Sequence, residues 1–131
     1  MNNKVNYKLY HGNSVYLSLR AVKNAISSNT EKQNLITIEA DAQKAQQIID
    51  SIQNQGLFVS KRVFLIKRLY KNKNKDSLIE KLLSLLNEQF PDDIYFWEDQ
   101  KIRSTTKYLK FFKSNDSVEE YTQLNKRNFL S

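Results

Sequence analysis

The sequence of 131 residues contains no cysteine, only two glycines, one proline and one histidine. Without cysteine the chain has no disulfide and no thiolate ligand for a metal ion, which agrees with a reducing compartment. So few glycines and prolines exclude a glycine-rich phosphate loop and a proline-rich linker. No apolar run approaches the roughly 20 residues of a membrane span, and no segment of signal-peptide type follows residues 1–4. We therefore expect a cytoplasmic protein with no membrane partner.

The net charge is +7, from 21 Lys and Arg residues against 14 Asp and Glu residues. Such a field favours anionic partners such as nucleic acid, although lysines spread over solvated faces give the same total. Basic and aromatic residues interleave in residues 107–113. Lys107, Lys110 and Lys113 either contact nucleic-acid phosphates or form the solvated side of an amphipathic helix whose apolar side is core.

Short segments of strand character alternate with segments of helical periodicity. Residues 63–66 are apolar at every position, which suits a strand covered on both faces. The alternation predicts one α/β domain, a three-layer α/β/α arrangement around a mostly parallel sheet with right-handed crossovers. Strands are expected at residues 7–10, 35–38, 62–67, 94–97 and 118–121.

Four helices are expected between these strands. Ser14 is a candidate N-cap for the first helix and Asp41 for the second. Ser77 and Glu80 have the spacing of a capping box at the start of the third helix, which Pro91 would end. Apolar residues at helical spacing predict a short fourth helix over residues 105–112.

A parallel α/β chain suggests nucleotide binding, but this sequence lacks the motifs that nucleotide binding requires. The first strand-to-helix turn, residues 11–14, contains neither G-x-x-x-x-G-K-[ST] nor G-x-G-x-x-G. The third strand ends in Lys67-Arg68, where an ATPase would carry an acidic partner for magnesium. These features indicate no ATP hydrolysis and no cofactor. His11, without a Ser/Asp or Cys partner set, is interpreted as a turn residue rather than a base.

A divalent-metal nuclease is the enzyme alternative. Asp92, Asp99 and Lys101 resemble a PD…(D/E)-x-K pattern, in which carboxylates hold the metal and the lysine assists the attacking water. The spacing is short for that pattern. Asp92 is equally interpreted as a polar residue in the turn after Pro91.

Leu57 and Phe58 stand directly after Gly56, between the expected second helix and third strand. Two large apolar side chains at this point are either part of the core or exposed on a turn at the edge of the sheet. On a turn they could anchor a protein partner, because a few large side chains at the centre of a contact contribute most of its affinity.

The chain resembles the N-terminal domain of the delta subunit of bacterial DNA polymerase III, the clamp-loader subunit that opens the sliding clamp. The stretch from Gln55 to Ile66 is similar to the family's small or polar residue, Leu-Phe pair, short linker, Lys-Arg pair and apolar strand. The opening strand and glycine turn at residues 7–14 and the order of elements up to Tyr121 also match. His11 departs from the family, in which a less bulky residue precedes the glycine.

The resemblance implies an AAA+ (P-loop NTPase-like) domain over residues 1–125 that has lost its nucleotide site and is not an enzyme. Residues 126–131 would begin a truncated lid domain or linker. The resemblance also makes Leu57 and Phe58 the hydrophobic wedge that enters a pocket on the sliding clamp (beta subunit) and loosens the ring at one subunit interface. Gln55, Gly56 and Val59 would flank this wedge. The other clamp-loader subunits would be partners of the full-length protein, and DNA an indirect one.

Overall fold

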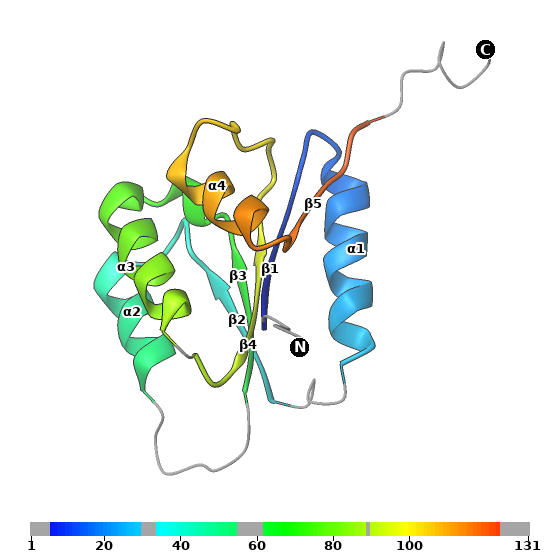
Figure 1. The fold of residues 1–131 in the computed structure, drawn as a ribbon. Helices are drawn as coiled ribbons and strands as arrows, with labels where there is room; N and C mark the ends of the chain where they lie inside the picture. Colours follow the sequence, from blue (N-terminus) through cyan, green and yellow to red (C-terminus); the bar gives the residue numbers. More distant parts are fainter. Residues whose placement is uncertain (1–5, 30–33, 55–61, 89, 124–131) are drawn as a thin grey trace, which may run out of the picture.

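A computed structural model of the chain describes residues 6–29, 34–54, 62–88 and 90–123 (Figure 1). Strands and helices alternate in the predicted order. The elements are β1 (Tyr7–His11), α1 (Val15–Ser27), β2 (Leu35–Glu39), α2 (Ala45–Gln53), β3 (Val63–Lys67), the 3-10 turn η2 (Leu69–Lys71), α3 (Lys75–Asn87), β4 (Asp93–Trp97), α4 (Lys107–Ser114) and β5 (Val118–Glu120).

The five strands form one sheet in the order β2-β3-β4-β1-β5, and every pair of neighbours is parallel. All strands therefore begin at one edge of the sheet, the amino edge, and end at the other, the carboxyl edge. The apolar residues 63–66 are buried along the whole of β3, as expected for a strand that lies between two others and is covered on both faces. The parallel sheet predicted from the alternation is confirmed.

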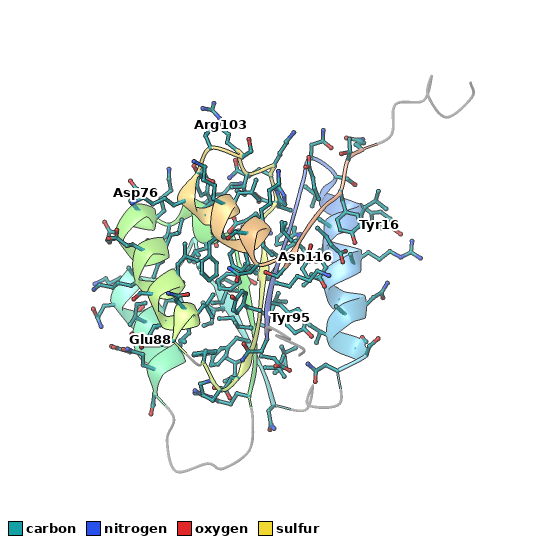
Figure 2. All side chains as sticks on the ribbon, viewed as in Figure 1. Tyr16, Asp76, Glu88, Tyr95, Arg103 and Asp116 are labelled. Carbon is teal, nitrogen blue, oxygen red and sulfur yellow. The ribbon has the colours of Figure 1, made fainter. Side chains whose placement is uncertain are left out.

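Helices cover both faces of the sheet, which confirms the three-layer arrangement. Helix α1 lies alone on one face, where Val22 and Ile26 pack near Tyr10, Leu65 and Trp97 (Figure 1). Helices α2, α3 and α4 cover the other face and form the larger core, and side chains fill the space between the layers (Figure 2). Apolar burial of this kind is the main favourable term in folding.

Helix α2 begins at Ala45, so the prediction that Asp41 caps it was wrong. Lys44 occupies the N-cap position, and its backbone N–H donates to the side chain of Gln47 at 3.4 Å. The preceding loop is held from a distance: the Asn72 side-chain amide donates to the carbonyls of Ala40 and Gln43, each at 2.8 Å. This bonding fixes residues 40–43 as a turn and delays the helix by one turn.

Helix α3 begins at Lys75, two residues before the predicted cap at Ser77. Asn74 occupies the N-cap position, and its backbone N–H donates to the Asn72 side-chain oxygen at 2.8 Å. The hydroxyl of Ser77 donates to the carbonyl of Asn74 instead of accepting from the helix. The capping box of Ser77 with Glu80 is therefore a wrong prediction.

Among the described residues, none of the helices is long and apolar enough to cross a membrane.

Candidate functional site

The predicted wedge residues, Leu57 and Phe58, and their neighbours Gln55, Gly56 and Val59 lie outside the described residues. The two ends of their segment are described. Helix α2 ends at Gln53 with Asn54 as its C-cap, and Arg62 immediately precedes β3. Both ends lie at the amino edge of the sheet, at the bottom of Figure 1.

Arg62 and the buried Asp92 form a partly buried ion pair at this edge. The Arg62 backbone N–H donates to Asp92 Oδ1 at 2.8 Å, and its guanidinium donates to Oδ2 from Nε at 3.2 Å and from Nη2 at 3.0 Å. The Arg62 side chain is 16% exposed and that of Asp92 is 7% exposed. This pairing favours a fixed geometry, because separating the charges would leave the buried carboxylate of Asp92 without a partner.

The opposite, carboxyl edge is where a nucleotide would bind in a parallel α/β domain. The turn between β1 and α1 there is occupied by the chain itself. The Ser14 N–H donates to the Tyr121 carbonyl at 3.1 Å, and the Tyr121 N–H donates to the His11 carbonyl at 2.8 Å. The Asn13 side chain accepts from the Gln123 N–H at 2.7 Å. Residues 121–123 thus cover the start of α1, and the Ser14 N–H that an anion would use is already bonded.

His11 is the last residue of β1 and is 1% exposed, so its interpretation as a turn residue was wrong. Its Nδ1 atom accepts a hydrogen bond from the Ile102 N–H at 3.0 Å. Burial lowers the pKa of this imidazole. The ring is consequently a neutral structural acceptor, held in place by the loop that follows β4.

Glu98 is a buried carboxyl group at the same edge, and it was not predicted from the sequence. It is fully shielded from solvent. It accepts hydrogen bonds from the Tyr70 N–H at 3.2 Å and from the Tyr108 hydroxyl at 2.6 Å. Burial raises the pKa of Glu98 to about 8, against the opposing effect of these hydrogen bonds. A carboxyl group in this position links η2 to α4 and is protonated at neutral pH.

We expect stability to fall as the pH rises from 6.5 to 8. The unfolded chain has Glu98 ionised above its ordinary pKa of 4.5, whereas the folded chain keeps the proton up to about 8. The folded state therefore binds more protons in this window, and its free energy of unfolding decreases by about 1.5–2 kcal/mol. His11 contributes little there, since its lowered pKa acts below its ordinary value of 6.5.

Glu98→Gln removes the ionisable group while keeping its size, and urea unfolding at several pH values measures the result. The decrease attributed to Glu98 should disappear in this variant and persist in the exposed control Glu88→Gln. If the free energy of unfolding of Glu98→Gln falls with pH as it does in the parent chain, another group causes the decrease.

The structure does not bring the nuclease residues together. Asp92 precedes β4 at the amino edge, and Asp99 follows it at the carboxyl edge, roughly 20 Å away along a strand that rises about 3.3 Å per residue. Asp92 pairs with Arg62, Asp99 with Arg68 and Lys71, and Lys101 with Glu120. In the part of the chain that the structure describes, no group of three or more His, Cys, Asp or Glu residues could hold a metal ion.

The basic residues of α4 lie where an amphipathic helix would place them. Tyr108, Leu109 and Phe112 are buried in the core, and Lys107, Lys110 and Lys113 are exposed on the other side. The amphipathic interpretation is confirmed. Contact of these lysines with nucleic acid stays a prediction.

The structure resembles the solved structures of two bacterial proteins. The fold resembles the Bacillus subtilis DNA clamp loader delta protein with a TM-score of 0.72 and 18% identity, over 94% of this chain and 40% of that chain. It also resembles a DNA polymerase III gamma subunit-related protein from Thermotoga maritima, with a TM-score of 0.51 and 10% identity over 95% of this chain and 43% of that one. A search of curated protein sequences returned no match. The fold is the α/β domain that these two solved structures contain, and this chain spans about two fifths of their length.

Sequence comparison then identifies the family. The family model for the DNA polymerase III delta subunit matches residues 19–122. The chain therefore belongs to the DNA polymerase III delta subunit family, as the resemblance of the Gln55–Ile66 stretch predicted.

Proposed function

We propose that this chain is the sliding-clamp-binding domain of a clamp-loader delta subunit, and that Leu57 and Phe58 are its wedge. The observation that carries the proposal is the family match over residues 19–122, which includes the whole segment 55–61. The described ends of this segment, Asn54 and Arg62, both lie at the amino edge of the sheet. The position of a nucleotide in related folds is at the opposite, carboxyl edge. A clamp that binds at the amino edge would not need to contact the carboxyl edge.

In this proposal the domain acts by binding and hydrolyses no ATP. The sequence carries neither phosphate-loop motif, and residues 121–123 bond to the start of α1. The work of the domain is to loosen the clamp ring by inserting apolar side chains at one subunit interface. Other clamp-loader subunits are the further partners of the longer protein, and DNA is an indirect partner through that complex. The proposed location is the cytoplasm.

The test is a calorimetric titration of the chain into its cognate sliding clamp, next to the variant Leu57→Ala/Phe58→Ala. Binding by the parent chain and its loss in a folded variant would support the proposal. A chain that does not bind the clamp would contradict it.

The same titration separates the wedge from the basic face of α4. A variant with Lys107, Lys110 and Lys113 changed to Gln removes three exposed positive charges and leaves residues 55–59 intact. We expect it to keep its clamp affinity. A DNA-binding role for these lysines would instead show as DNA affinity that falls steeply with salt and is lost in this variant.

A further inference from the structure

We infer that Arg62 is a positioning residue for clamp binding, because together with Asp92 it ties the two ends of the 55–61 segment to each other. The inference rests on the proposed function and adds to it a residue that does not itself enter the clamp. It is carried by contacts that one side chain makes to three separate parts of the fold: the end of α2, the start of β3 and the start of β4.

The first set of contacts joins Arg62 to the end of α2. Its guanidinium donates to the carbonyl oxygens of Ser51 at 3.5 Å and Ile52 at 3.1 Å, and to that of Asn54. The last carbonyls of a helix have no partner within the helix and carry the negative end of its dipole. A guanidinium at this place satisfies three of these oxygens and fixes the point at which the chain leaves α2.

The second set of contacts joins Arg62 to the sheet. The three hydrogen bonds to Asp92 involve both its backbone and its guanidinium, so the main chain is held as well as the side chain. The Asp93 N–H donates back to the Arg62 carbonyl at 3.2 Å, and the guanidinium carbon lies 4.9 Å from the centre of the Phe64 ring. These contacts fix the point at which the chain enters β3.

Asp92 is itself held in place. The side-chain amide of Asn6 donates to its carbonyl at 2.6 Å, which joins the start of β4 to the residue before β1. The partner of Arg62 is thus anchored to the centre of the sheet. The pair thus fixes two described points of the chain, the end of α2 at Asn54 and the start of β3 after Arg62.

Fixed end points affect binding because any segment that joins two fixed points loses less conformational freedom when it meets a partner. We therefore expect Arg62→Gln to weaken binding of the cognate clamp by about tenfold, a change of about 1.4 kcal/mol. The conservative variant Arg62→Lys keeps the charge but loses the planar fork of the guanidinium. Its clamp affinity should lie between those of the parent chain and Arg62→Gln. Asp92→Asn should also weaken binding, and the double variant should bind no worse than Arg62→Gln alone.

Arg68→Gln is the matched control. Arg68 also pairs with two carboxylates, Glu39 and Asp99, but it lies at the carboxyl edge of the sheet. The change removes the same charge and a similar network, and clamp affinity should stay within about twofold of the parent chain. All affinities are measured by calorimetry at a temperature at which circular dichroism shows each variant fully folded, because a loss of global stability then leaves Kd unchanged. If Arg62→Gln does not fold, Arg62→Lys replaces it in the comparison.

The outcomes separate this inference from the proposed function. The inference is overturned, and the proposed function kept, if folded Arg62 variants bind like the parent while Leu57→Ala/Phe58→Ala does not bind. It is also overturned if Arg68→Gln weakens binding equally, or if the effects of Arg62→Gln and Asp92→Asn simply add. If the Leu57→Ala/Phe58→Ala change has no effect on binding, both the wedge and its positioning residue are rejected.

Discussion

Replacing Leu57 and Phe58 together by alanine should weaken binding to the sliding clamp by about a hundredfold or more while leaving the domain folded. Each large apolar side chain contributes about 1.5–3 kcal/mol when a contact buries it fully. Two such losses add to at least about 3 kcal/mol, and every 1.4 kcal/mol is a factor of ten in Kd. Few other contacts could replace this loss, because the affinity of a protein interface is concentrated in a few large side chains.

The control removes two exposed apolar side chains from a different, described place. Val15 and Tyr16 begin α1 and are 46% and 70% exposed, and Tyr16 points away from the sheet in Figure 2. Val15→Ala/Tyr16→Ala should bind the clamp like the parent chain. Equal binding by Leu57→Ala/Phe58→Ala would place the contact elsewhere. Unfolding of that variant, seen by circular dichroism, would show that the two side chains belong to the core.

The strands could be predicted from the sequence because their signals are local. Residues 63–66 are continuously apolar, and a strand between two others and under helices on both faces needs that composition. The alternation of strands and helices then limits the connections to parallel, right-handed ones. The sheet order, with β1 between β4 and β5, follows from long-range packing that the alternation alone does not specify.

The starts of α2 and α3 were missed because one side chain, that of Asn72, bonds near both of them. Asn72 bonds to the carbonyls of Ala40 and Gln43 through its amide and to the Asn74 N–H through its oxygen. Asp41 and Ser77 have the right chemistry for N-caps, but the turns that Asn72 fixes place the helix starts elsewhere. Local capping rules describe which residues can cap a helix; a tertiary contact selects the start of α2, and a side-chain bond that spans two residues selects that of α3.

The buried polar groups could be predicted least. Glu98 and Arg62 each follow or precede an apolar strand, as many exposed residues do, and their sequence neighbourhood does not indicate burial. Glu98 is buried because η2 and α4 both close over the end of β4 and supply donors to it. Arg62 is mostly shielded from solvent, and Asp92, thirty residues away, accepts its hydrogen bonds. Such partners come together only when the fold is complete.

The second large effect is expected from Gly12→Ala, which should lower the free energy of unfolding by about 3–5 kcal/mol. Gly12 has a φ angle of 130°, a conformation that side chains rarely adopt and that costs other residues about 1–3 kcal/mol. A Cβ atom there would also lie 2.0 Å from the Tyr121 carbonyl oxygen and 2.6 Å from the Tyr121 nitrogen. The backbone of residue 121 would have to move away, and each hydrogen bond that it makes to His11 and Ser14 contributes about 0.5–1.5 kcal/mol.

Asn13→Ala is the matched control, since it changes the same turn without adding an atom near Tyr121. It removes the hydrogen bond from the Gln123 N–H and should cost about 1 kcal/mol. Urea unfolding of both variants gives the comparison. A loss of less than about 1 kcal/mol in Gly12→Ala would mean that residues 121–123 are held only weakly against the turn. A loss of about 3–5 kcal/mol in the free energy of unfolding would show that backbone packing closes the place where related folds bind a nucleotide's phosphates. This closure adds to the absence of the phosphate-loop lysine. Restoring a phosphate-loop lysine alone would then not create a nucleotide site, because the Tyr121 backbone would still occupy the turn.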